Sequence, residues 1–160
     1  MASIRLFDAE RDLPGLRRGV VELQEFERAL EPSLPRGEEI ADAYIADMLE
    51  HCERWTGAVF VADKDGEVVG FVSVFARVPA TEPDEAPAPY AMIQDLLIAP
   101  AHRGHGLGAQ LLSRAEVFAR EAGATILRVS TLAGNAQALE LYDAFGYERR
   151  MVELVKRLAG

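Results

Sequence analysis

The sequence predicts an α/β protein in which a mixed β-sheet is flanked by helices. Short apolar runs typical of strands are interspersed with longer segments in which apolar residues recur every three or four positions, as on one face of a helix. The order of these segments is β-α-α-β-β-β-α-β-α-β. A strand, a helix and a second strand follow one another over residues 91–131, and such a unit pairs its two strands in parallel through a crossover.

The length and composition indicate a single domain spanning residues 1–160. Of the 160 residues, 49% are hydrophobic and 27% are charged, which suits one core of ordinary composition. No stretch approaches the roughly 20 apolar residues that a membrane span needs, and the N-terminus lacks the layout of a signal peptide. The single cysteine, Cys52, excludes an internal disulfide. We therefore expect a cytoplasmic protein without a membrane partner.

The net charge of −9 argues against a nucleic-acid partner, because proteins that bind nucleic acids neutralise phosphates with a basic face. The charge is unevenly distributed along the chain. Residues 1–90 carry 19 acidic and 9 basic side chains, a net −10, whereas residues 91–160 carry 7 and 8, a net +1. Either this acidity serves solubility alone, or the two parts of the chain face ligands of opposite charge.

The first ninety residues predict one strand, two helices and a hairpin. Asp65-Gly66 lies between two β-rich runs and is a preferred centre for a tight hairpin turn. Four prolines and three acidic residues between Arg77 and Tyr90 predict an extended acidic loop. The expected segments are a strand at 4–7, helices at 12–30 and 38–56, and hairpin strands at 58–62 and 68–76.

The remaining residues predict three strands and two helices. Pro100 ends a strand, Gly123 caps a helix, and Asn135 opens a second helix that stops at Gly146. The expected segments are strands at 91–98, 125–131 and 147–157 and helices at 107–122 and 135–145.

Three glycines lie within five residues where the strand at 91–98 ends and the next helix begins. Gly104, Gly106 and Gly108 have no side chain to keep a ligand from the backbone N–H groups, and the helix N-terminus adds partial positive charge. Arg103 can form two parallel hydrogen bonds to a phosphate. The junction therefore predicts an anion site.

Two other phosphate-binding loops fit this segment less well. A Walker A loop is excluded because no Gly-Lys-Ser/Thr follows the glycines. Gly104, Gly106 and Ala109 match the dinucleotide pattern GxGxxG/A, but a dinucleotide fold needs an acidic residue about 20 positions later, and the following strand ends without one. His102 and His105 lie in the turn itself, where a metal ion would compete with phosphate, so no metal site is expected.

The same junction resembles the pyrophosphate loop of the GNAT superfamily of N-acetyltransferases, whose motif RxxGxG/A is matched by Arg103, Gly106 and Gly108. The strand before it is similar to the family's central strand. The segment from Asn135 to Tyr147 is similar to the family's late motif, NxxAxxLYxxxGF/Y. These specific motifs lie within residues 92–147, and the likeness in element order covers nearly the whole chain.

The resemblance implies that acetyl-CoA is the co-substrate. Relatives hold its pyrophosphate on loop amides and its pantetheine arm along the strand, in a V-shaped gap between the strands at 91–98 and 125–131. It implies that Asn135 reaches the cofactor arm and that Tyr142 protonates or hydrogen-bonds the leaving thiolate. The implied cofactor-binding residues are Leu96, Leu97, Ile98, Arg103, Gly104, His105, Gly106, Leu107, Gly108, Ala109 and Asn135.

The general base is where the sequence departs from the family pattern. Many members have Glu at the position of Gln94, and an amide cannot accept the amine proton. Asp95 is the neighbouring carboxylate and the candidate base. Adjacent residues of a regular strand face opposite sides, so only one of the two is expected to face the substrate. A water chain to a carboxylate in the first half of the chain is an equal alternative.

These features predict an enzyme that moves an acetyl group from acetyl-CoA to a primary amine of a small, cationic acceptor, by direct attack through a tetrahedral intermediate. Two alternatives stay open. The acceptor is instead a lysine or N-terminal amine of a protein, since the acidic loop at 77–90 suits a basic peptide. Or the chain is a CoA-binding regulatory domain without catalysis, as Gln94 in place of Glu suggests. A homodimer is common among the relatives, and nothing in the sequence demands one.

Overall fold

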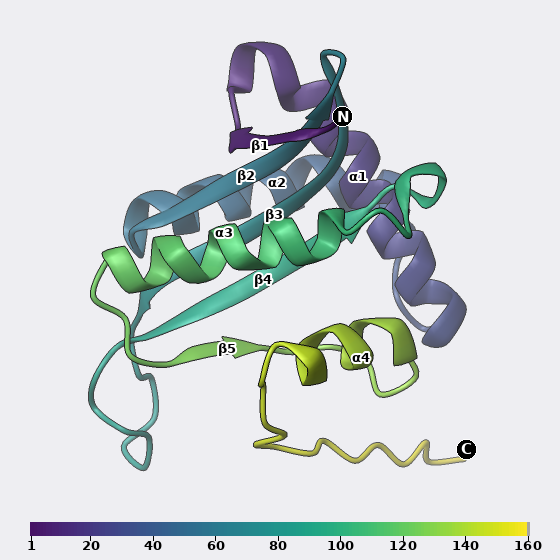
Figure 1. Ribbon diagram of the computed structural model, residues 1–160. Coiled ribbons are helices and arrows are strands. Elements are labelled where there is room, and N and C mark those ends of the chain that lie inside the picture. Colours follow the sequence, from purple (N-terminus) through teal and green to yellow (C-terminus); the bar gives the residue numbers. More distant parts are fainter. Residues whose placement is uncertain (160) are drawn as a thin grey trace.

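The computed structural model describes residues 1–159 and has a five-stranded sheet with helices on both faces (Figure 1). The strands are β1 (Ser3–Leu6), β2 (Gly57–Lys64), β3 (Glu67–Val78), β4 (Tyr90–Ile98) and β5 (Leu127–Val129). The helices are α1 (Ala9–Leu30), α2 (Gly37–Arg54), α3 (Leu107–Glu121) and α4 (Ala136–Ala144), with a 3-10 turn at Pro100–His102. Within residues 1–159, no helix is both long and apolar enough to cross a membrane.

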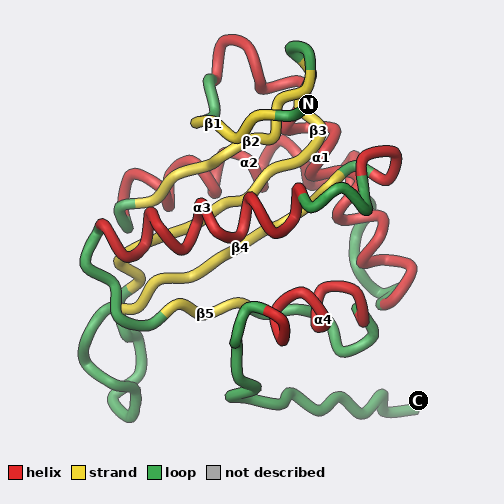
Figure 2. Tube along the Cα trace, viewed as in Figure 1, coloured by secondary structure: helices red, strands yellow, loops and turns green. Residues whose placement is uncertain are grey.

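The strands lie side by side in the order of the chain, from β1 to β5. Strands β1 to β4 pair antiparallel, and β4 and β5 pair in parallel, as the crossover over residues 91–131 predicts. The parallel pair follows from the position of α3, which returns the chain to the same end of the sheet before β5 begins. Figure 2 shows the mixed sheet and its helices by element type.

Two clusters of buried apolar side chains attach the helices to the two faces of the sheet. One lies between the sheet and α3, and the other lies between the sheet and the pair α1 and α2. Phe71 and Val72 of β3 belong to opposite clusters because side chains alternate along a strand. Representative members are Phe60, Val72, Ile93 and Leu111 on the α3 side, and Leu16, Ile45, Phe71 and Leu97 on the other.

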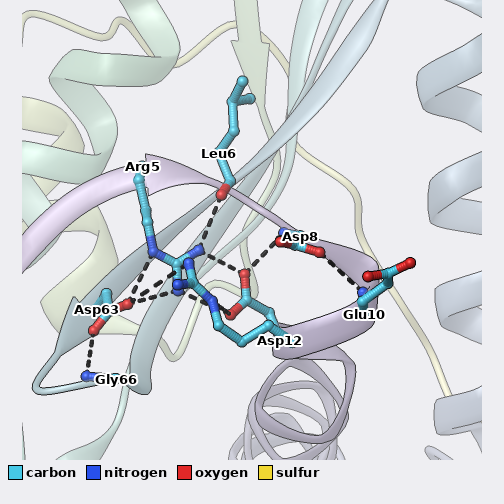
Figure 3. A network of polar contacts seen from close by, with 8 residues as sticks. Arg5, Leu6, Asp8, Glu10, Asp12, Asp63 and Gly66 are labelled. Atoms are coloured by element: carbon cyan, nitrogen blue, oxygen red, sulfur yellow. Dashed lines mark hydrogen bonds and ion pairs between the residues drawn. The ribbon is translucent and has the colours of Figure 1, made fainter.

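Arg5 of β1 joins the sheet to α1 through a network of charges (Figure 3). Its guanidinium donates to the two carboxylate oxygens of Asp12 at 2.6 and 2.8 Å, and to Asp63 Oδ2 at 2.6 and 2.9 Å. The Asp8 backbone N–H also donates to Asp12, at 2.8 Å. These hydrogen bonds, those from Arg5 first, lower the pKa of the buried Asp12 carboxyl to about 2.

The Asp12 carboxylate stabilises the fold above its ordinary pKa of 3.8, and this stabilisation is lost as the pH falls toward the folded-state pKa of about 2. The difference corresponds to about 2 kcal/mol. We expect Asp12→Asn to lower the free energy of unfolding by about that amount at pH 7 and by much less at pH 2. Urea denaturation at the two pH values measures it, and an equal loss at both would contradict the ionic role.

Helix α1 begins at Ala9, three residues before the expected start at Asp12. The cause is Asp8, whose side chain accepts a hydrogen bond from the Glu10 backbone N–H at 3.0 Å and so caps the helix. Asp12 therefore lies inside the first turn, where its carboxylate faces Arg5 instead of opening the helix.

The strand expected at 147–157 is wrong for the described chain. Residues 148–159 form neither helix nor strand, and in Figure 1 they run below α4 without joining the sheet. A strand forms only where a neighbouring edge satisfies its backbone groups. Here two ion pairs hold the segment beside the helices instead, from Arg149 to Asp143 at 2.8 Å and from Arg157 to Glu31 at 2.5 Å.

Candidate active site

Strands β4 and β5 separate partway along their length, which confirms the V-shaped gap. Only Ala91–Ile93 of β4 pair with Leu127–Val129 of β5. Beyond Ile93, residues 94–98 of β4 have no strand beside them on that side within the described chain. This free edge offers backbone N–H and C=O groups to an extended ligand, which can bind as a strand would.

The turn after β4 contains two glycines in the left-handed conformation. Gly104 and Gly106 have φ angles of +80° and +79°, a conformation that other residues rarely adopt. A Cβ on either glycine would contact nothing within 4 Å, so the backbone conformation, not lack of room, requires glycine. Gly106 also caps α3 without a side-chain hydrogen bond. The first N–H groups of α3 are therefore available to an anion.

Arg103 belongs to this turn, and a hydrogen bond from its Nε ties the side chain to the end of β4. Its Nε–H donates to the backbone carbonyl of Ile98 at 2.9 Å. Its guanidinium lies over the ring of Phe26, with 5.7 Å between the guanidinium carbon and the ring centre. Across residues 1–159 its terminal nitrogens form no hydrogen bond, so they can contact a phosphate.

The free edge, the turn and α4 line one cavity of about 410 Å³. Of the eleven residues that the resemblance implies in cofactor binding, ten line this cavity and only His105 does not. Leu23 and Phe26 of α1 complete the lining. They lie three residues apart in the sequence, the spacing of the apolar face of a helix, and this pattern does not separate core residues from pocket walls.

Two polar residues at α4 line this cavity, one at its N-cap and one inside the helix. Asn135 caps the helix, because its Oδ1 accepts from the Ala138 backbone N–H at 3.2 Å, and its amide nitrogen forms no hydrogen bond within residues 1–159. Tyr142 lines the cavity and is 8% exposed. Burial, with a smaller effect of the Asp95 charge, raises the pKa of Tyr142 to about 12. The hydroxyl group therefore keeps its proton at neutral pH.

A β-bulge at Gln94 overturns the expectation that Gln94 and Asp95 face opposite sides. Consecutive residues of β3 pair with Ile93 and with Asp95, so Gln94 is an extra residue in β4. Its Nε2 donates to the hydroxyl oxygen of Tyr44 at 3.2 Å, and the same hydroxyl donates to Asp95 Oδ1 at 2.6 Å. Both side chains therefore meet at one phenol on α2, because the bulge interrupts the alternation.

Asp95 is a buried carboxylate, 5% exposed, whose two oxygens are both hydrogen-bonded. Tyr44 donates to Oδ1, and the hydroxyl of Ser73 donates to Oδ2 at 2.7 Å. Burial raises the pKa of Asp95 above its ordinary value, although the two hydrogen bonds oppose the rise. Burial and the Asp95 charge likewise raise the pKa of Tyr44.

Glu27 of α1 is a second carboxylate of this cluster, and the sequence does not single it out. It is half-buried and follows Phe26 of the cavity wall. Burial and then the charge of Asp95 raise its pKa. Among residues 1–159, nothing forms a hydrogen bond or ion pair with its carboxylate. Helix α1 carries other glutamates close to Glu27 in the sequence. The sequence does not separate Glu27 from them, because only the structure shows that it lies near Asp95 of β4.

The acidic loop expected at 77–90 lies away from this cluster. In the structure it spans residues 79–89 and precedes Tyr90, whereas the glycine-rich turn follows Ile98 at the other end of β4 (Figure 2). None of its residues lines the cavity. Glu85 accepts a hydrogen bond from the Thr81 backbone N–H of the same loop at 2.8 Å.

Comparison with known proteins finds relatives in sequence. A sequence profile described as the acetyltransferase (GNAT) family matches residues 23–147. An uncharacterized N-acetyltransferase of Bacillus subtilis, YhfO, is 32% identical over 108 residues, which cover 68% of each chain. The aminoalkylphosphonate N-acetyltransferase of Salmonella typhimurium is 30% identical over 117 residues, which cover 73% of this chain and 71% of that protein.

Solved structures show the same fold at lower identity. A transcriptional regulator from Bacillus halodurans has a TM-score of 0.74 and 21% identity, covering 99% of this chain and 100% of the other. The aminoglycoside acetyltransferase AAC(6')-Iy, solved with a bisubstrate analogue that contains CoA, has a TM-score of 0.69 and 22% identity, covering 99% of both chains. These two likenesses concern the fold.

Proposed function

The chain belongs to the GNAT family and is an acetyl-CoA-dependent N-acetyltransferase, and from this premise we propose that its acceptor is a primary amine on a small, cationic molecule. One observation carries the proposal. The cavity joins an anion-binding turn to the free edge of β4, and a pair of carboxylates that do not line it, Glu27 and Asp95, each adjoin a lining residue in sequence, Phe26 and Leu96. The first part suits a phosphate-containing donor, and the second suits a positively charged acceptor.

The residues present fit acetyl-CoA. The N–H groups from Gly104 to Ala109 and the guanidinium of Arg103 would hold the pyrophosphate, since the glycine conformation and the uncapped helix leave them free. The backbone at Leu96–Ile98 would pair with the pantetheine arm, and the Asn135 amide would contact it. A backbone N–H at Leu96 or Leu97 would stabilise the oxyanion that forms when the amine attacks the thioester.

Tyr142 would donate a hydrogen bond to the departing sulfur. Its pKa of about 12 keeps the proton in place, but it also makes complete transfer to a thiolate with a pKa near 8.5 unfavourable by roughly 5 kcal/mol. The hydroxyl therefore stabilises the negative charge on sulfur without giving up its proton. The attacking nitrogen gives its second proton to solvent as the tetrahedral intermediate collapses, and CoA leaves as the thiol after it takes a proton from solvent.

Glu27 and Asp95 would have different tasks at the amine. An aliphatic amine with a pKa of about 10 arrives as an ammonium ion and must lose a proton before it attacks. The Glu27 carboxylate, which has no partner among the described residues, would bind the positive charge. The amine proton would pass to the Tyr44 oxygen while the Tyr44 proton passes to Asp95 Oδ1 along their 2.6 Å hydrogen bond. The raised pKa of Asp95 favours its protonated form.

Glu27→Gln should raise the KM for a cationic primary amine about tenfold and leave kcat nearly unchanged, because it removes one charge-assisted contact. The KM for an uncharged amine of the same size should not change. Steady-state assays with matched amines at low and high ionic strength measure this, and salt should reduce the preference of the wild type for the cation. An unchanged KM for the cation would exclude Glu27 from acceptor binding.

Tyr44→Phe tests the proposed transfer of the amine proton to Asp95. It should lower kcat about 100-fold by breaking the proton path to Asp95, with little effect on the KM of the amine. Thermal unfolding and acetyl-CoA binding are the controls for its fold. A wild-type kcat in this variant would contradict the path.

The acidic loop at 79–89 lies away from the cavity, so a small acceptor is proposed in place of a basic peptide.

A further inference from the structure

Ser73 of β3 is a polar side chain in a row of buried aromatic ones. Side chains alternate along a strand, so Phe71, Ser73 and Phe75 share the face of the sheet that α1 and α2 cover. All three residues are 0% exposed. A hydroxyl in such a place costs free energy unless it is hydrogen-bonded. The reason for keeping it there must therefore lie in its partner.

The partner of this hydroxyl is Asp95, which the bulge in β4 places directly opposite. Strand β3 pairs Val74 with Ile93, and a regular ladder would next pair Ser73 with Gln94. Because Gln94 is the extra residue, Ser73 pairs with Asp95 instead. Residues opposite one another on neighbouring strands have their side chains close together. The Ser73 hydroxyl accordingly donates to Asp95 Oδ2 at 2.7 Å.

The two oxygens of Asp95 are held from two different elements. Oδ2 accepts from Ser73 of β3, and Oδ1 accepts from Tyr44 of α2 at 2.6 Å. Within residues 1–159, the Ser73 hydroxyl forms no second side-chain hydrogen bond. The torsion that turns a carboxylate is broad, so one hydrogen bond alone would fix its orientation only loosely. The two hydroxyls together determine which oxygen faces Tyr44.

Hydroxyl groups also supply the favourable contacts to the Asp95 charge. Tyr44 donates to it, and Gln94 contacts the same phenol. After burial, the Asp95 charge is the next cause that raises the pKa of Glu27 on α1 and of Tyr142 on α4. No cation of residues 1–159 pairs with Asp95, and its pKa is raised by burial and lowered only by its two hydrogen bonds. Ser73 therefore helps to keep a buried carboxylate ionised.

We propose that Ser73 is a positioning residue for the amine proton transfer, whose hydroxyl holds Asp95 Oδ2 so that Oδ1 faces Tyr44 and the carboxylate stays ionised until the amine arrives. The inference rests on the proton path of the proposed function. In that step an N–H bond of the ammonium ion breaks and its proton bonds to the Tyr44 oxygen, while the former Tyr44 proton bonds to Oδ1. Ser73 keeps its own proton. Stability alone does not require the pair, since apolar replacement of both partners of a buried hydrogen bond can be nearly neutral.

Ser73→Ala in the full chain tests the proposal. It removes one hydrogen bond to a buried charge, which disfavours the ionised form of Asp95. The midpoint of the Asp95 titration, followed by carboxyl-carbon NMR without substrate, should rise by about one pH unit. The acidic limb of kcat/KM against pH should move up by the same amount, because this profile reports the groups of the free enzyme. The ionisation of the amine contributes equally to both enzymes.

Val74→Ala is the matched control. Val74 is the buried neighbour of Ser73 on the same strand but packs on the α3 side, so this variant should unfold at a lower temperature and leave both midpoints unchanged. Ser73→Cys keeps a weaker donor of similar shape and should move both midpoints in the same direction by a smaller amount. It replaces Ser73→Ala if that variant does not fold.

Two results would overturn the proposal, and they differ in what they say of the proton path. An Asp95 midpoint that stays in place when the Ser73 hydroxyl is removed would show that Ser73 does not control the carboxylate, and the path through Tyr44 would stand. A raised midpoint with an unmoved acidic limb would show that Asp95 does not receive the amine proton. The path itself would then be wrong.

Discussion

Tyr142→Phe should lower kcat about 100-fold while the affinity for acetyl-CoA stays within about twofold. The substitution keeps the buried ring, which packs at a centroid distance of 5.5 Å from that of Tyr147, and removes only the hydroxyl of this cavity-lining residue. The loss falls on kcat because the hydrogen bond strengthens as negative charge develops on the sulfur. Steady-state kinetics and calorimetric titration with acetyl-CoA measure the two quantities.

Tyr147→Phe is the control for that experiment. Tyr147 is the neighbouring tyrosine but does not line the cavity, so its variant should keep the wild-type kcat. If Tyr142→Phe and Tyr147→Phe were equally active, Tyr142 would have no part in the chemistry.

Gly106→Val should weaken acetyl-CoA binding about 100-fold. A side chain at φ +79° costs at least 1–2 kcal/mol in the left-handed region, and a β-branched one costs more. The turn relieves this strain by moving to negative φ, which redirects the N–H groups that would hold the pyrophosphate. Titration with acetyl-CoA measures the effect, and desulfo-CoA can replace it to exclude turnover.

Gly123→Val separates cofactor binding from general strain. Gly123 has a φ angle of +86°, and a Cβ there would also contact nothing within 4 Å. Gly123 lies just beyond the C-terminal end of α3, however, whereas Gly106 caps the N-terminal end of the same helix. This variant should lose a similar amount of stability and bind acetyl-CoA normally. Normal binding by Gly106→Val itself would refute the phosphate cradle.

Local signals in the sequence predicted most of the fold. Asp65 and Gly66 form the hairpin turn with φ angles of +54° and +86°, as a turn of this kind requires. The glycine-rich turn and the cap at Asn135 are local in the same sense. The bulge at Gln94 could not be predicted from neighbouring residues, because it depends on how β4 aligns with β3. Residues 147–157 were predicted as a strand and form none, because the residues of a segment do not say whether the edge of a sheet is available to it.

The candidate site was only partly predictable. The motifs named ten cofactor-binding residues and Tyr142, all of which line the cavity, because a glycine-rich turn and a helix N-cap are recognisable in the sequence. The proposed acceptor side rests on Glu27 and Tyr44, two helical residues that meet Asp95 only in three dimensions. The net negative charge of residues 1–90 was a weak guide to the proposed acceptor side. Several acidic residues of the first ninety pair with arginines at the surface, such as Glu38 and Asp42 with Arg17, and the acidic loop lies elsewhere.

Release of free CoA thiol from acetyl-CoA, measured against a panel of amines, tests the central claim most directly. The panel should include aminoglycosides, polyamines, amino acids and peptides, each compared with an uncharged analogue of similar size. We expect thiol release that requires a small cationic primary amine, with an equal amount of N-acetyl product by mass spectrometry. No thiol release with any amine, together with no thermal stabilisation by acetyl-CoA, would contradict acetyl transfer by this chain.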